Sequence, residues 1–114
     1  MDRKQRGIYC EEKVSSYLEE KGYLILERNF RIPLGEIDII ASCGSVLCAV
    51  EVKSVSGSWG LEELSSQISP AKRARIKKTL SIYLAQNPDN KYDLIRFDAA
   101  AVKGSEVIYL EGAF

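Results

Sequence analysis

Hydrophobic side chains recur along the chain with two periods, one typical of helices and one typical of strands. From residue 6 to 21 the apolar positions are spaced by three and four, which predicts an amphipathic helix that ends at Gly22. A second helix is predicted from Ser69-Pro70, a capping serine followed by a proline at the first helical position, to about Gln86. The side chains expected to face inward are Cys10, Val14, Tyr17, Leu18, Ile76, Leu80, Tyr83 and Leu84.

Alternating apolar and polar residues predict strands around these helices. Residues 23–30 form the first, residues 35–53 form a pair, and residues 92–102 and 106–110 form the last two. The order is helix, three strands, helix, two strands. At 114 residues the chain is long enough for one core. The pattern predicts a single α/β domain over residues 1–114, with a mixed sheet and helices in flanking layers.

The pair of strands is expected to be a hairpin that turns at residues 42–45. If the turn is symmetric about Cys43 and Gly44, Asp38 pairs with Ala49 and Glu36 with Glu51. Because side chains alternate between faces, one face carries only apolar residues and must be covered: Ile37, Ile39, Ala41, Val46, Cys48, Val50 and Val52. The other carries Glu36, Asp38, Ile40, Leu47, Ala49, Glu51 and Lys53.

Three acids on this second face need positive charge nearby. Opposed like charges on a sheet are unfavourable, and partly buried carboxylates are costly unless paired. Lys53 supplies one charge, and a divalent cation would supply the rest. Mg²⁺ takes one or two carboxylates, keeps waters and uses phosphate oxygens. The alternative is a solvated strand face, although the apolar neighbours on this face argue against a plain solvent surface.

Composition narrows the chemistry further. The chain has no histidine, and its three cysteines form no Cys-x-x-Cys pair, so histidine-based triads, disulfide frameworks and zinc sites are disfavoured. No apolar run approaches the ~20 residues of a membrane span, and residues 1–6 lead into no signal-peptide core. We expect a cytoplasmic location without a membrane partner. Sixteen basic and sixteen acidic residues argue against a protein that coats nucleic acid.

Three further features have two interpretations each. Glu11 lies at the margin of the first helix's apolar stripe; it either faces the sheet or is a first-turn acid favoured by the helix dipole. Trp59, in the small-residue loop after Lys53, either contacts substrate or anchors a connector. The second helix carries basic residues that either contact nucleic acid or form an ordinary exposed face: Lys72, Arg73, Arg75, Lys77 and Lys78.

Together these residues could support phosphodiester hydrolysis, which needs an activated water and stabilisation of charge on phosphorus and the leaving oxygen. Asp38 and Glu51 are the expected ligands of Mg²⁺ or Mn²⁺, with the main-chain carbonyl of Val52 as a third. Lys53 would orient water or stabilise charge, and Glu11 would reach the metal or its waters. The basic helix would hold the DNA backbone without reading sequence.

These residues resemble a known nuclease superfamily, named for its Pro-Asp…(Asp/Glu)-x-Lys signature and shared by restriction enzymes and archaeal Holliday-junction resolvases. More closely, the chain is similar to the YraN-type family of small bacterial proteins predicted to be endonucleases. The matching residues lie between Arg6 and about Lys103: Gly22-Tyr23, Asn29, Arg31, Gly35-Glu36-Ile37-Asp38, Val50-Glu51-Val52-Lys53, Pro70-Ala71-Lys72 and Arg96-Phe97-Asp98. Two positions depart from the pattern, Cys10 where a glycine is expected and Ile37 in place of proline.

The resemblance implies a restriction-endonuclease-like αβββαβ core. It also implies an active centre of Asp38, Glu51 and Lys53, with Glu11 as the helix acid of the resolvase branch. Glu36 belongs to the motif and either binds metal or braces the strand. The expected substrate is DNA, with branched or damaged forms as candidates, and cutting two strands would call for a homodimer. The alternatives are a non-catalytic nucleic-acid-binding module on the same scaffold and a structural subunit whose basic helix faces an acidic protein.

Overall fold

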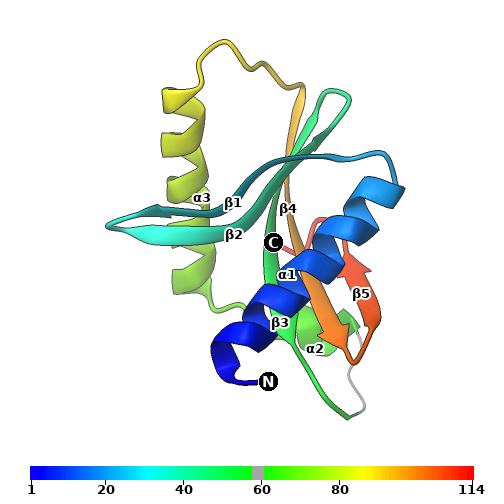
Figure 1. Cartoon of the computed structure of the whole chain (residues 1–114). Helices are drawn as coiled ribbons and strands as arrows, with labels where there is room; N and C mark the ends of the chain where they lie inside the picture. Colours follow the sequence, from blue (N-terminus) through cyan, green and yellow to red (C-terminus); the bar gives the residue numbers. More distant parts are fainter. Residues whose placement is uncertain (58–60) are drawn as a thin grey trace.

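The computed structural model describes residues 1–57 and 61–114 and shows a twisted sheet between helices (Figure 1). In chain order the elements are α1 (Arg3–Glu20), β1 (Leu24–Ile32), β2 (Gly35–Cys43), β3 (Val46–Ser54), α2 (Leu61–Ser66), α3 (Pro70–Gln86), β4 (Leu94–Lys103) and β5 (Glu106–Leu110). Both long helices and all five strands were predicted, whereas α2 was not. The interpretations of Trp59 concern a residue outside the described ranges.

Side-chain caps determine where the helices begin. In α1 the Asp2 carboxylate accepts a hydrogen bond from the Gln5 backbone N–H, and the Gln5 side chain accepts one from the Asp2 N–H. This capping box starts the helix three residues earlier than the apolar pattern predicted. Gly22, with a φ of 92°, follows its end, as expected. The Ser69 side chain caps α3 by accepting from the Lys72 N–H, and the predicted bounds of α3 are confirmed.

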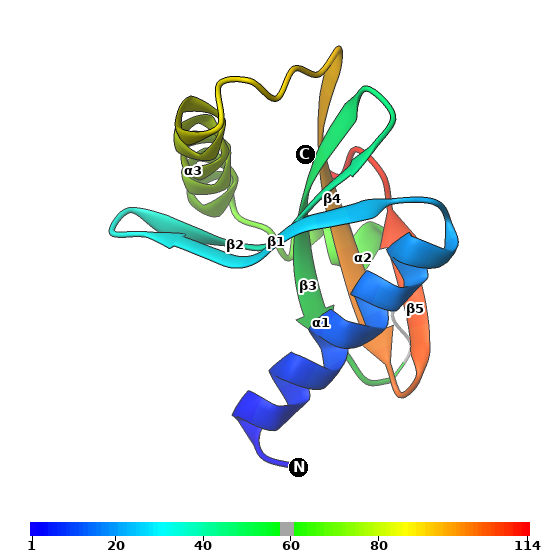
Figure 2. The same cartoon turned by 45° about the horizontal axis from the view of Figure 1, so that its top comes forward.

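The sheet has the strand order β1-β2-β3-β4-β5. Only β3 and β4 are parallel, and the other neighbouring pairs are antiparallel. A parallel pair needs a long crossover, which α2 and α3 supply. Helix α1 lies on one side of the sheet and α3 on the other (Figure 2). The fold is the predicted restriction-endonuclease-like αβββαβ core, with a mixed sheet flanked by helices. None of the described helices is both long and apolar enough to span a bilayer.

The β2–β3 hairpin differs from the prediction in register. Cys43 pairs with Val46 and Ile39 with Val50, so the turn consists of Gly44 and Ser45. A φ of 58° at Gly44 suits the two-residue hairpin turns, which require positive φ. The pairing is therefore two residues away from the predicted one. Since side chains alternate with period two, this shift leaves the faces unchanged.

The corrected register changes which residues of the hairpin lie level with one another. Continued beyond the last paired residues, it brings Asp38 opposite Glu51, where Ala49 had been expected. The predicted pairing of Glu36 with Glu51 is likewise wrong. The two carboxylates most important for the predicted site are therefore closer along the strands than the symmetric turn suggested.

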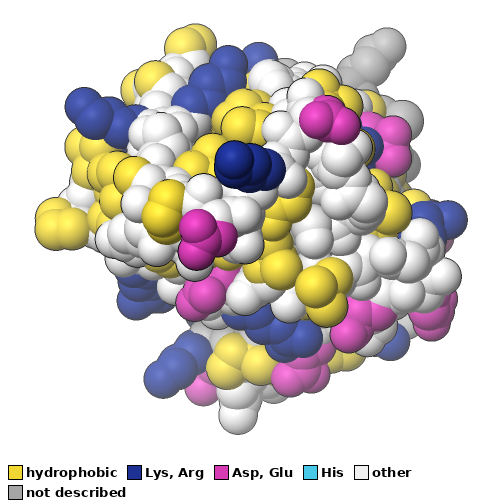
Figure 3. Space-filling model, turned by 90° about the horizontal axis from the view of Figure 1, so that it is seen from above, with side chains coloured by type: hydrophobic (Ala, Val, Ile, Leu, Met, Phe, Trp, Pro, Cys, Tyr) yellow, Lys and Arg dark blue, Asp and Glu magenta, His cyan; other side chains and the backbone are white. Residues whose placement is uncertain are grey.

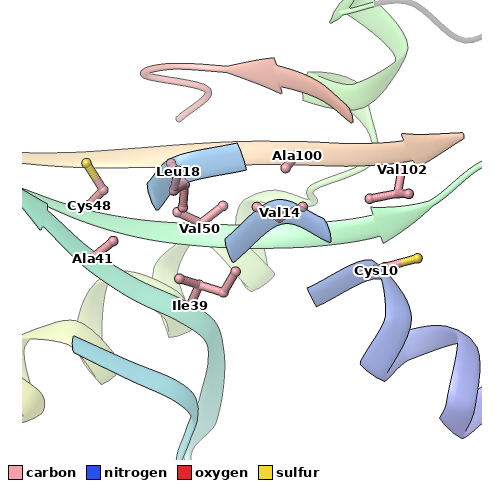
Figure 4. Packing of buried hydrophobic residues seen from close by; sticks show 9 residues of the cluster. All are labelled: Cys10, Val14, Leu18, Ile39, Ala41, Cys48, Val50, Ala100 and Val102. Carbon is pink, nitrogen blue, oxygen red and sulfur yellow. The ribbon is translucent and has the colours of Figure 1, made fainter. Parts of the chain in front are cut away.

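The face of the sheet beneath α1 is apolar, as predicted. One of the residues predicted to lie on this face packs elsewhere. Figure 4 shows side chains of α1 packed onto β2, β3 and β4 in one buried cluster. Its members are Cys10, Val14, Leu18, Ile39, Ala41, Cys48, Val50, Ala100 and Val102. Ile37 is the exception, because it packs with Ile40 in the cluster beneath α3. The residues of β2 before Ile39 pair with β1 but not with β3. This part of the β1–β2 hairpin leaves β3 and extends toward α3 (Figure 1).

Helix α3 packs closely on the start of β2. A Cβ atom at Gly35 would lie 2.8 Å from the Thr79 hydroxyl oxygen, so only glycine fits this approach. The cluster on this side comprises Ile37, Ile40, Leu47, Ala49, Ile76, Leu80 and Tyr83. Beside it, α2 packs Leu64 against Ala99 and Ala101 of β4. The close contact of α3 with β2 brings the first turns of α3 beside the acidic end of the hairpin.

Candidate metal and phosphate site

A pocket of about 200 Å³ lies where β2, β3 and the start of α3 meet. Asp38 and Glu51 both line it, as the hairpin pattern predicted from their shared face. The full lining consists of Gly35, Glu36, Asp38, Glu51, Lys72, Arg75 and Ile76. Adjacent strands thus deliver three carboxylates, and the helix delivers two cations, to the same small volume.

Asp38 occupies the point where β2 separates from β3. Its Oδ2 accepts a hydrogen bond from the Val52 N–H at 2.8 Å, in place of a strand-to-strand bond. Burial, followed by the negative charge of Glu51, raises the pKa of Asp38 to about 7, although the Val52 bond lowers it. Glu11 and Glu36 raise it further. Such a carboxylate is poorly compensated by its surroundings and would gain from a nearby cation.

Glu51 is the more buried acid, with 7% of its side chain exposed. Its Oε1 lies 2.6 Å from the Lys72 Nζ and 3.8 Å from the Lys53 Nζ, so two ammonium groups share one carboxylate oxygen. Burial and the neighbouring Lys72 lower the pKa of Lys53. Burial is the largest single influence on Lys72 and lowers its pKa, but the hydrogen bond and the negative charge of Glu51, with smaller contributions from Lys53 and Asp38, together raise the Lys72 pKa.

Glu11 approaches from α1, on the opposite side of the sheet. It lies well beyond the first turn of a helix that begins at Arg3, so the dipole interpretation is wrong. Its Oε1 accepts a hydrogen bond from the Asn29 Nδ2 at 2.9 Å. It does not line the pocket, yet it is near enough to raise the pKa of Asp38. Glu11 therefore borders the site from behind the point where β2 and β3 separate.

Asn29 has an unusual backbone for a strand residue. Its φ is 52°, and no other non-glycine residue in the described ranges has positive φ. The flanking pairs Arg28–Ile39 and Phe30–Ile37 place it opposite Asp38. Asparagine tolerates the left-handed region better than most residues. An asparagine inside an otherwise alternating strand was the sequence signal for this feature, but its contact with Glu11 was not predicted.

The donor set suits a hard divalent cation. Among residues 1–57 and 61–114, no three acidic or cysteine side chains gather into a metal-binding group. Mg²⁺ does not require three, since it is held by one or two carboxylates together with waters and phosphate oxygens. The Val52 N–H points toward Asp38, and in a strand the carbonyl of the same residue points the same way. Asp38, Glu51 and the Val52 carbonyl are therefore compatible with Mg²⁺ or Mn²⁺.

The basic residues of α3 are divided among different surroundings. Lys72 and Arg75 line the acidic pocket. Arg73 instead donates to the carbonyls of Ser65 and Ile68, both at 2.8 Å, and so joins α2 to α3. Lys77 lies over the ring of Phe97, beside a separate groove, and Lys78 is exposed. The five cations therefore do not form one continuous surface.

Two further observations bear on charge, one at the pocket and one over a wider surface. Glu36 lines it and also pairs with Arg31 on β1, whose Nε lies 3.2 Å from the Glu36 Oε1. Glu36 thus braces the β1–β2 hairpin while facing the site. On the side of the molecule seen in Figure 3, acidic, basic and apolar side chains are interspersed, and neither charge sign forms a continuous field.

Comparison with known proteins identifies one family and several of its members as similar to this chain. Residues 10–102 match the family described as "Uncharacterised protein family UPF0102". A UPF0102 protein of Sulfurihydrogenibium sp. is 40% identical over 100% of this chain and 97% of its own length. One from Thermodesulfovibrio yellowstonii is 39% identical over 100% and 99%. Among solved structures, SfsA of Pyrococcus furiosus in complex with Ca²⁺ aligns with 96% of this chain and 63% of that chain, at 19% identity and a TM-score of 0.34.

Proposed function

We propose that this chain, which belongs to the UPF0102 family, is a Mg²⁺- or Mn²⁺-dependent endonuclease that hydrolyses phosphodiester bonds in DNA. The observation that carries the proposal is the convergence of Asp38 and Glu51, from adjacent strands, on one pocket that also contains Lys72 and Arg75. Carboxylates that hold a cation beside basic side chains that attract phosphate are the components that phosphodiester hydrolysis needs.

Each residue has a role consistent with its position. Asp38, Glu51 and the Val52 carbonyl would hold the cation, which supplies Lewis-acid stabilisation and lowers the pKa of bound water. Lys53, within 3.8 Å of Glu51, would orient the attacking water or stabilise charge on the phosphate. Glu11, anchored by Asn29, would hold outer waters from the α1 side.

DNA is proposed to enter on the α3 side of the sheet. Arg75 is exposed and lines the pocket, so it is placed to contact a backbone phosphate. Lys77 and Lys78 lie further along α3 and would contact neighbouring phosphates, whereas Arg73 is occupied by main-chain carbonyls. We propose branched or damaged DNA as the substrate, cut by a homodimer when both strands are cleaved.

The test is cleavage of junction, flap and single-stranded DNA by the purified protein with Mn²⁺ or Mg²⁺. Asp38→Asn and Glu51→Gln keep the side-chain size while removing the charge, and each should lower the cleavage rate by roughly 10³-fold, a typical effect of losing an essential electrostatic group. Glu106→Gln serves as the control, because it makes the same acid-to-amide change at an exposed residue that does not line the pocket. Cleavage by the wild type that persists in Asp38→Asn would contradict the proposed site.

A second candidate is a nucleic-acid-binding module without catalysis. It is favoured by the ion pair of Glu51 with Lys72, which neutralises one carboxylate without any metal. Calorimetric titration with Mn²⁺ separates the two candidates. The endonuclease should bind the ion at millimolar concentration or below, and its DNA binding should survive in Asp38→Asn. DNA binding without any divalent-ion binding would favour the module.

A further inference from the structure

We infer that Lys72 is the resident counter-ion of Glu51 and competes with the divalent cation for that carboxylate, so that release of Lys72 accompanies loading of the site. This inference rests on the proposed function and assigns Lys72 a role distinct from general attraction of DNA. Lys72 is a positioning residue in this scheme, because it controls when Glu51 is free to bind metal.

The geometry distinguishes Lys72 from the motif lysine. The Lys72 Nζ lies 2.6 Å from the Glu51 Oε1, whereas the Lys53 Nζ lies 3.8 Å from the same atom. Lys53 is only two residues from Glu51 in the sequence, and Lys72 is twenty-one away. The shorter charge-assisted hydrogen bond is the stronger one. Glu51 is therefore paired mainly with the lysine from α3.

The start of α3 holds Lys72 in this position. Its backbone N–H donates to the Ser69 hydroxyl at 3.2 Å, and Pro70, two residues before Lys72, is the first residue of the helix. The backbone is thus held by the helix cap, while a flexible four-carbon stem carries the ammonium. The side chain is 33% exposed, so the ammonium can leave Glu51 without unfolding the helix.

A cation bound at Glu51 and the Lys72 ammonium would place like charges on one carboxylate oxygen, which is unfavourable. Loading of the site therefore requires Lys72 to move away. The released ammonium would remain beside Arg75 in the pocket lining, where a phosphate can accept its hydrogen bonds. Binding of a phosphate-bearing substrate and binding of the cation should then strengthen one another, because each favours the same Lys72 position.

The test compares Mn²⁺ affinity by calorimetry in the wild type, Lys72→Met and Arg75→Met, without DNA. Arg75 is a matched control, since it lines the same pocket with the same charge but has no ion pair with Glu51 among the described residues. Lys72→Met should bind Mn²⁺ about tenfold more tightly than wild type, with Arg75→Met changed by less than about threefold. Equal effects of both substitutions, or weaker binding in Lys72→Met, would overturn the competition.

A second measurement follows Lys72 in the wild-type protein, so its result does not depend on whether Lys72→Met folds correctly. Lysine amines labelled by reductive ¹³C-methylation give separate signals, and Lys72→Gln assigns that of Lys72. Saturating Mg²⁺ should shift the Lys72 signal by more than that of Lys78, as its ion pair breaks. Mg²⁺ binding without a Lys72 shift would refute the inference alone. No Mg²⁺ binding by wild type or Lys72→Met would refute the proposed function, and the inference with it.

Discussion

Two aspartates on different strands, one fully buried and one half-buried, show opposite ways of accommodating a carboxylate in this sheet. Asp98 on β4 is fully buried and accepts hydrogen bonds from the Arg96 guanidinium, the Tyr109 hydroxyl at 2.6 Å and the Gly112 N–H at 2.9 Å. Asp38 on β2 accepts one bond, from the Val52 N–H, and none to its Oδ1 within the described residues. Asp98 faces a closed network, and Asp38 faces a pocket.

The difference separates a structural charge from one available for chemistry. Hydrogen bonds to Asp98 raise the pKa of Arg96, which shows that this pair stabilises its own charges. Burial, then the charge of Asp98, raises the pKa of the Tyr109 hydroxyl, so it stays a proton donor to the carboxylate. For Asp38, burial and nearby acids disfavour its charge. Satisfied polar networks add rigidity, whereas a poorly compensated carboxylate is a functional-site candidate.

The largest effect on stability is expected at the closed network. Asp98→Asn removes the charge that balances Arg96 and should lower the free energy of unfolding by about 3–5 kcal/mol, as loss of one partner of a buried pair does. Urea unfolding followed by circular dichroism measures this. Asp38→Asn is the matched control and should not destabilise at pH 7. Equal destabilisation by both substitutions would remove the distinction between the two aspartates.

The next effect is a pH dependence specific to Asp38. Its folded-state pKa of about 7 lies above the ordinary value of 3.8, so the folded protein holds this proton more tightly than the unfolded chain does. The resulting stability is complete below pH ~4 and is lost as pH rises through 7. Relative to Asp38→Asn, the wild type should lose about 2–4 kcal/mol between pH 4 and 8. A pH-independent difference in unfolding free energy between the two proteins would contradict this.

A bound cation should reverse part of that loss. At pH 8, Mn²⁺ at ten times its dissociation constant should raise the unfolding free energy of the wild type by roughly 1.4 kcal/mol, as expected for a ligand that binds only the folded state. Thermal unfolding with and without Mn²⁺ measures the shift. Asp38→Asn should show little of it, whereas Tyr109→Phe, altered only beside Asp98, should keep it. A shift that survives in Asp38→Asn would place the ion elsewhere.

The smallest stability effect is expected at Asn29. Asn29→Gly accepts the φ of 52° without strain but removes the amide that donates to Glu11. The relief of backbone strain and the loss of one hydrogen bond have opposite effects on the free energy of unfolding. These effects should cancel to within about 0.5 kcal/mol. Mn²⁺ affinity, measured by calorimetry, should nevertheless fall severalfold if Glu11 supports the site. Unchanged affinity in Asn29→Gly would exclude Glu11 from that role.

Local chemistry determined much of this fold from the sequence alone. Ser69-Pro70 was sufficient to locate the start of α3, because a cap and its first helical residue are neighbours in the chain. The period-two pattern assigned Asp38 and Glu51 to one face, and this survived a two-residue error in register because the faces repeat every two residues. Helix α2 was missed because its six residues are too short to show a helical period.

Contacts between distant residues were decided only by the tertiary structure. The pairing of Lys72 with Glu51 depends on how α3 packs on β2, and that depends on the absence of a Cβ at Gly35. The bond from Asn29 to Glu11 depends on a left-handed residue inside a strand, which the alternation pattern does not reveal. A sequence pattern records which face a side chain takes. Its partner across the fold is set by packing, which depends on every element at once.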